Sequence, residues 1–189
     1  MAEDRLSHEN RRTNEDRHTN QNRHSNDGRG AAGLQANFRA LIGVAMVEAA
    51  NRGAPLVEAE HLLLGFLFDR TGTATAVLGR EGLSYAAFDQ ALEEERKQTL
   101  AAVGVTLPEP DRLKAAPRSR LGRPRFGASA KDAWHRAAAS RGPGRSRRFF
   151  DIDLMLGILA AELGTVPRAL ARAGFDRQQL IAALQEARS

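Results

Sequence analysis

The sequence has 189 residues, with 28 Lys and Arg against 23 Asp and Glu, which gives a formal net charge of +5. This length suits one domain or two small ones, and a hydrophobic content of 42% is enough to form a core. The absence of Cys excludes disulfides, thiolate zinc sites, iron–sulfur clusters and cysteine nucleophiles.

Residues 1–30 carry almost no apolar side chains, so we predict a disordered polar tail there. His8, His18 and His24 are unevenly spaced in this tail, and we expect neither a metal site nor a cofactor. The longest apolar run, 62–68, is far shorter than the roughly 20 residues that span a bilayer. With no apolar signal segment at the N-terminus, we expect a soluble cytoplasmic protein.

Apolar residues recur at helical spacing from residue 34 onward. The pattern predicts a helix over 34–49, a nearly all-apolar helix over 62–68 and a short helix over 74–78. Ser84 is a suitable N-cap for a fourth helix, which can continue to about Val103. The first half of the chain therefore forms a unit of four helices.

The same pattern recurs 92 positions later without a gap. Matched positions are Leu34 and Phe126, Leu62 and Leu154, Gly65 and Gly157, Gly72 and Gly164, and Gly82 and Gly174. We therefore predict an all-α fold of about eight helices, in which two four-helix repeats pack about a pseudo-twofold axis to close one core. Within a domain of residues 31–189, repeat one covers 34–103, a linker covers 104–125 and repeat two covers 126–187.

Two helix starts can be predicted in the second repeat. Pro167 stands where a first-turn proline is tolerated. Asp176 and Gln179 have the spacing of a capping box before the last helix.

The motif Glu60-His61-Leu62-Leu63-Leu64-Gly65, followed by Gly72-Thr73-Ala74, Leu78 and Gly82, resembles the Clp N-terminal repeat domain, most of all that of ClpC-type unfoldases. The resemblance covers residues 34–187 and is weaker in the second copy, where Ile152-Asp153 replaces the Glu-His pair. It implies an all-α double repeat that receives substrates and adaptors.

In ClpC-type unfoldases this domain precedes two ATPase modules. A P-loop requires a Gly followed by Lys, and none of the 17 Gly residues here is followed by Lys. We therefore expect a freestanding domain that is not an enzyme, although a Clp protease label can attach to it by family.

Glu60 is the strongest candidate ligand residue. The resemblance implies that the Glu of the Glu-His pair binds phosphorylated arginine, and a carboxylate suits a guanidinium because it accepts a forked pair of hydrogen bonds. A helix N-terminus or a hydroxyl near it would take the phosphate. The resemblance implies two such sites, one per repeat, but Ile152 replaces the second Glu, and the family tends to place Thr where this chain has Gln35 and Gly127. We therefore expect one site to be lost and the other to be altered. The alternative is that Glu60 only stabilises its helix N-terminus, by about 0.3–1 kcal/mol.

His61 lies among core Leu residues, so a capping or core role is expected rather than that of a catalytic base. The resemblance also implies a peptide-binding groove between the first helices of the two repeats, lined by Phe126 and its repeat partner Leu34. An ordinary hydrophobic staple is the alternative for Phe126. Trp134 matches Ile42, which predicts packing in the core.

Residues 112–148 carry twelve Lys and Arg against one Asp. Within this segment, Arg141, Arg145, Arg147 and Arg148 form a basic Gly-Pro loop. Such a segment is either a solvated surface or a contact for polyanions.

These observations support two functions. The first is a non-catalytic protein-binding module of the Clp proteolysis system, an accessory or decoy that binds ClpC-type unfoldase components, adaptors, client proteins or peptides. The alternative is a nucleic-acid-associated protein that binds through residues 112–148. A third class, a hydrolytic enzyme, has no nucleophile, metal set or acid–base pair in its favour.

Overall fold

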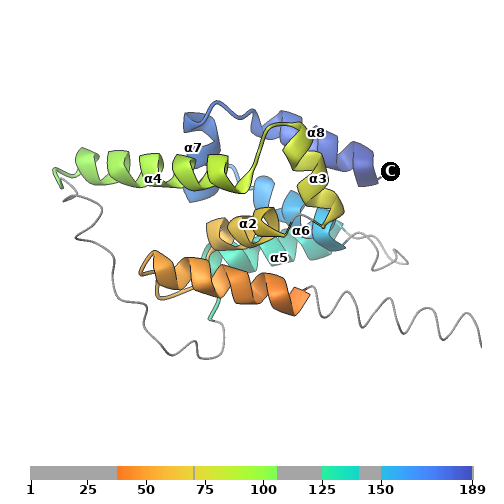
Figure 1. Cartoon of the computed structure of the whole chain (residues 1–189), viewed down its shortest axis with the longest axis horizontal. Helices are drawn as coiled ribbons and strands as arrows, with labels where there is room; N and C mark the ends of the chain where they lie inside the picture. Colours follow the sequence, from red (N-terminus) through yellow and green to blue (C-terminus); the bar gives the residue numbers. More distant parts are fainter. Residues whose placement is uncertain (1–37, 70, 106–124, 141–149, 189) are drawn as a thin grey trace, which may run out of the picture. The chain divides into compact units, whose positions relative to one another are not determined.

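The computed structural model describes residues 38–69, 71–105, 125–140 and 150–188 (Figure 1). A helix over residues 38–51 comes first. It is followed by α2 (Ala59–Phe68), α3 (Thr73–Arg80), α4 (Tyr85–Ala102), α5 (Ala128–Ser140), α6 (Phe150–Leu159), α7 (Thr165–Arg172) and α8 (Arg177–Arg188). The described residues contain no strand, only an isolated parallel bridge between Val57 and Phe126. The predicted all-α fold is confirmed.

The chain divides into two compact units, Met1–Arg39 and Ala40–Ser189. Of the first unit, only residues 38–39, which begin the first helix, are described. The predicted tail, most of the linker and the basic loop lie outside the described residues. Helices α2 to α8 all belong to the second unit.

Helix order and packing both show the internal repeat. α7 begins and ends 92 residues after α3, since Thr165 follows Thr73 and Arg172 follows Arg80 at that interval. α4 packs against α7, and α3 packs against α8. Exchanging the two repeats turns the first contact into the second, as a pseudo-twofold relation requires.

Helices α2 and α6 form the centre of the core. Both are apolar on nearly every side, because each is enclosed by helices of both repeats, and such helices need no polar face. Their fully buried side chains include Leu62, Leu63, Leu64, Ile152, Leu154, Met155, Ile158 and Leu159.

A glycine permits the same close helix crossing in each repeat. A Cβ on Gly65 would lie 3.0 Å from the carbonyl oxygen of Leu41, and a Cβ on Gly157 would lie 2.3 Å from that of Ala133. The two pairs of positions are equivalent in the repeat, with the same offset of 92 residues. The matched glycines therefore serve to let two helix backbones approach closely.

The helix caps agree with the sequence in part. The Ser84 hydroxyl accepts a hydrogen bond from the Ala87 amide at 3.2 Å, which confirms the predicted N-cap. The Asp176 carboxylate accepts from the Gln178 amide at 2.8 Å. The predicted capping box was wrong in one respect. The Gln179 side chain donates to Glu81 at 2.6 Å instead of binding the backbone amide of Asp176. A contact between repeats has replaced a local one.

No helix in the described ranges is both long enough and apolar enough to cross a membrane.

Candidate functional site

Glu60 lies in the first turn of α2 and is half-buried. Burial raises the pKa of its carboxyl; the hydrogen bond from its own backbone amide opposes this shift, and the nearby charges of Glu58 and Glu95 add to it. Arg52 is close enough to lower the pKa slightly. A partly desolvated carboxyl near other carboxylates favours a cationic partner over an anionic one.

Glu58, two residues earlier, connects the two repeats. Its carboxylate accepts a hydrogen bond from the Ser129 amide at 3.1 Å and from the Ser129 hydroxyl at 2.6 Å. The same hydroxyl accepts from the Ala59 amide at 2.9 Å. Because Ser129 lies in the first turn of α5, the Glu58 carboxylate stabilises that helix terminus as an anion.

Gly127 provides the space for this carboxylate. A Cβ at this position would lie 1.7 Å from Glu58 Oε1 and 2.1 Å from its Cδ, so no larger residue fits without moving the carboxylate. The Gly127 backbone is fixed as well, since its amide donates to the carbonyl of Val57 at 2.9 Å. Glu58 and Gly127 therefore form a matched pair across the repeats.

His61 has the capping role expected from its position. Its Nδ1 accepts a hydrogen bond from the Glu58 amide at 3.0 Å, which requires an unprotonated Nδ1. Burial and, to a smaller extent, the nearby positive charge of Arg52 lower the pKa of His61 to about 4. A buried imidazole in this state serves the fold and has no access to a substrate.

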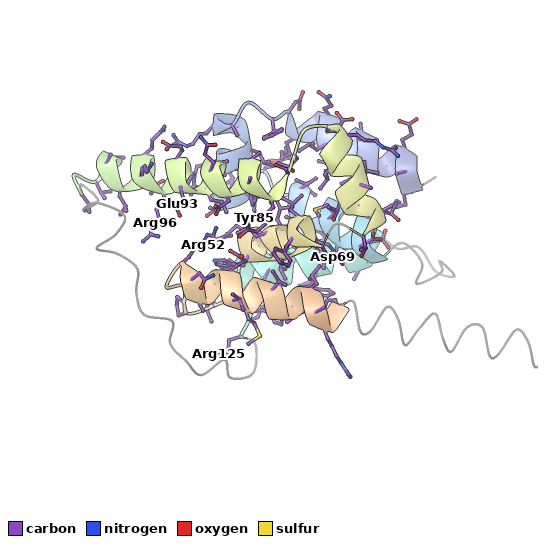
Figure 2. The ribbon with its side chains drawn as sticks, viewed as in Figure 1. Arg52, Asp69, Tyr85, Glu93, Arg96 and Arg125 are labelled. Atoms are coloured by element: carbon purple, nitrogen blue, oxygen red, sulfur yellow. The ribbon has the colours of Figure 1, made fainter. Side chains whose placement is uncertain are left out.

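A partly buried ionic cluster holds the helix over 38–51 to α4. Arg52 pairs with both Glu48 and Asp89. The Tyr85 hydroxyl donates to Glu48 at 2.8 Å; burial, together with this carboxylate, raises the pKa of Tyr85 to about 12. Arg52 and Tyr85 are labelled in Figure 2. Apart from Arg52 Nε, which is buried and has no hydrogen-bond partner among the described residues, the polar groups of these side chains bind one another. The cluster is therefore a structural clamp.

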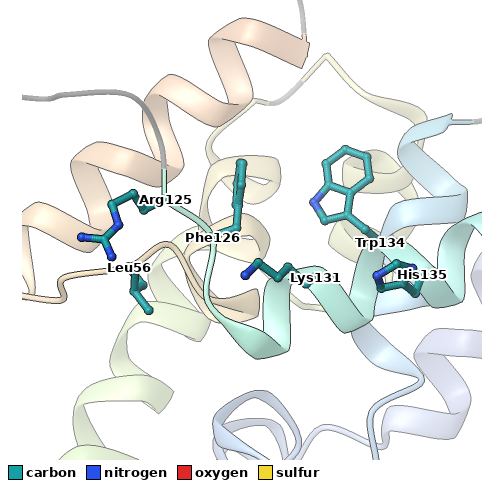
Figure 3. A pocket seen from close by; sticks show the side chains of 6 residues that line it. All are labelled: Leu56, Arg125, Phe126, Lys131, Trp134 and His135. Atoms are coloured by element: carbon teal, nitrogen blue, oxygen red, sulfur yellow. The ribbon is translucent and has the colours of Figure 1, made fainter.

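A groove of about 570 Å³ lies beside α5. It is lined by Leu56, Arg125, Phe126, Lys131, Trp134 and His135 (Figure 3). Lys131, Trp134 and His135 have i, i+3, i+4 spacing and therefore share one face of α5. Figure 3 shows the rings of Phe126 and Trp134 pointing to the same side of this helix.

Backbone pairing between the repeats positions this groove. The Val57 amide donates to the Arg125 carbonyl at 2.8 Å, and the Val57 carbonyl accepts from the Gly127 amide at 2.9 Å. Together these two bonds form the bridge between Val57 and Phe126. Leu56 directly precedes Val57 and so lies next to this crossing. The groove is therefore assembled from both repeats.

The candidate site residues lie in different places. Phe126 lines the groove, whereas Glu60 is not among the described residues that line it. Leu34 and Gln35 lie outside the described residues, as do Arg141, Arg145, Arg147 and Arg148.

The role of Trp134 was predicted incompletely. It is half-buried and lines the groove, although its repeat partner Ile42 is buried in the core. Two residues were not predicted from the sequence: Lys131 at the groove, and Glu58 at the contact between the two repeats. The helical spacing of Lys131 from Trp134 was a usable signal, whereas nothing local marked Glu58.

In the ranges that the structure describes, no group of three or more His, Asp and Glu side chains is arranged to hold a metal ion.

Comparison with solved structures supports the fold. The chain is similar to the crystal structure of the N-terminal domain of the caseinolytic protease associated chaperone ClpD from Arabidopsis thaliana, with a TM-score of 0.50 and 21% sequence identity. The alignment covers 79% of this chain and 89% of that one. No protein-family model matches the sequence, and no curated protein matches it. The likeness establishes a fold like that of a Clp N-terminal domain.

Proposed function

We propose that this chain is a protein-binding module of a Clp-type proteolysis system, acting as an accessory or decoy for an unfoldase of the ClpC type. The observation that carries the proposal is the fold, which covers 89% of the N-terminal domain of a caseinolytic protease associated chaperone. The groove beside α5 supports it, because it offers a concave, partly aromatic surface built by both repeats.

Glu60 carries a second part of the proposal, the binding of a guanidinium group such as that of phosphoarginine. Its partly desolvated carboxyl suits a cation. The N-terminus of α5 is not free to bind the phosphoryl group, because the Glu58 carboxylate already accepts hydrogen bonds there from the amide and the hydroxyl of Ser129. A phosphoarginine ligand that used this helix terminus would have to displace Glu58.

Degradation of a model substrate by a reconstituted ClpC-type unfoldase and its protease tests the proposal. A decoy lowers the degradation rate as its concentration rises, and an accessory raises it. No change in rate, together with no binding to the unfoldase or its substrate, would refute the function. Glu60→Ala should weaken binding of a phosphoarginine peptide, whereas Glu186→Ala, which removes an exposed carboxylate on α8, should not.

A further inference from the structure

The charged side chains that line the α5 groove are all basic. Arg125, Lys131 and His135 contribute basic side chains, and no carboxylate is among the described lining residues. All three are exposed, and neither Arg125 nor Lys131 forms an ion pair with a carboxylate in the described part of the chain. The positive charges of Arg125 and Lys131 are therefore available to a partner.

Several other basic residues of the unit already have partners within the fold. Arg136, on the same helix, donates from Nε to the carbonyl of Gly157 at 2.8 Å. Arg168 donates to Glu95 at 2.7 Å, and Arg188 donates to Asp153 at 3.2 Å. The groove cations thus differ from the cations that hold the helices together.

The lining also has an apolar part. Leu56, Phe126 and Trp134 are all half-buried, so each presents part of its surface to the groove. A cavity of about 570 Å³ accommodates side chains of a short peptide segment. Aromatic rings here can bury an apolar side chain while the cations of the same groove pair with carboxylates.

We infer that the groove beside α5 binds an acidic linear segment of another protein, in which Asp or Glu residues flank a large apolar side chain. The carboxylates would pair with Arg125 and Lys131, and the apolar side chain would pack against Phe126 and Trp134. This inference rests on the proposed role as a protein-binding module and adds the chemistry of its partner.

The same surface is less suited to a nucleic acid. Binding a phosphate backbone without sequence preference requires cations that follow the strand over several nucleotides. Here the described cations line a single groove together with aromatic side chains, and the exposed Asp132 lies next to Lys131 in the sequence. An oligonucleotide is therefore a competing occupant that the experiment must test.

Trp134 supplies the readout, because it is the only Trp in the chain and it lines the groove. The full chain is titrated with a peptide of Asp and Glu residues around one Phe, and the emission of Trp134 is followed. The same peptide with Asn and Gln, and one with Ala in place of Phe, serve as controls. We expect the acidic peptide to bind about tenfold more tightly than its amide counterpart, with an affinity that falls as salt rises.

Two variants locate the binding. Lys131→Glu should lower the affinity for the acidic peptide by about tenfold or more, because it replaces an attraction with a repulsion. Lys97→Glu, an equal change of charge on α4, should leave the affinity unchanged. Circular dichroism checks that both variants are folded, which is expected because both side chains are exposed.

Equal affinity for the acidic and amide peptides, or no effect of Lys131→Glu, would overturn the inference. So would tighter binding of a single-stranded oligonucleotide with the same dependence on Lys131, or self-association that alters Trp134 emission as the protein is concentrated. If the chain changes Clp degradation but shows no acidic preference, the proposed function stands and this inference fails. If the acidic peptide binds as expected but the chain neither alters degradation nor binds the unfoldase or its substrate, the inference stands and the role in Clp proteolysis fails.

Discussion

Replacing Gly127 with Ala tests the pairing of the two repeats at the Glu58 carboxylate. The added methyl would lie 1.7 Å from Glu58 Oε1, so the carboxylate must leave its position. It would then lose both hydrogen bonds from Ser129, at 3.1 and 2.6 Å. Glu58 is half-buried, so a displaced carboxylate can reach water and is not left unsolvated.

The magnitude follows from these two bonds. Hydrogen bonds to a charged group contribute about 1.5–3 kcal/mol each, and hydration of the released carboxylate returns part of that. The poorer N-cap propensity of Ala and the smaller entropy of the unfolded chain roughly cancel. We therefore expect Gly127→Ala to lower the free energy of unfolding by about 2 kcal/mol.

A double-mutant cycle with Glu58→Ala isolates this contact. Glu58→Ala alone should also cost about 2 kcal/mol, because it removes the same bonds. Once Glu58 is Ala, adding Gly127→Ala should cost almost nothing, since its methyl enters the vacated space. Urea unfolding followed by far-UV circular dichroism measures all four proteins. Additive costs for the two substitutions would show that Glu58 and Gly127 do not meet, and would refute the reasoning.

The helix crossings and the buried imidazole give two further predictions. Gly157→Ala should cost about 2–3 kcal/mol, because its Cβ would lie 2.3 Å from the backbone oxygen of Ala133, whereas Gly65→Ala should cost less because its nearest oxygen would be 3.0 Å away. Gly79→Ala, with nothing within 4 Å, should stabilise α3 by up to about 1 kcal/mol in the same urea assay, and equal costs at the two crossings would contradict the geometry. Because the pKa of His61 is lowered to about 4 in the fold, the unfolded chain takes up the proton first, so stability is complete above pH 6.5 and falls as the pH drops toward 4. The loss between pH 7 and pH 5 should be about 2 kcal/mol larger in the natural protein than in His61→Gln, and parallel pH profiles would show that His61 is not buried in its neutral form.

The sequence predicts the parts of the fold that depend on local pattern. Helical spacing and the recurrence of Gly65 as Gly157 predict the double repeat, because each repeat needs a glycine at the same close crossing of two helices. The fate of Gln179 could not be predicted, because its bond to Glu81 depends on how the repeats pack. Glu58 and Gly127 are 69 residues apart in the sequence, and only the chain crossing at Val57 brings them together. Sequence pattern also could not show that Trp134 departs from its repeat partner by lining a surface groove.

Polar groups at the seam between the repeats are largely satisfied by the opposite repeat. Glu58 of the first repeat stabilises the start of α5 in the second, and Asp151 of the second accepts from the Ala74 amide in the first turn of α3 at 3.1 Å. Arg168 and Glu95 also pair across the seam. A ligand that enters the seam must break such contacts, each of which is costly to leave unmade. Arg125 and Lys131 of the α5 groove pair with no carboxylate in the described ranges, so the same attraction to a partner yields more net binding free energy there. This difference favours the groove over the seam as the place where a partner first binds.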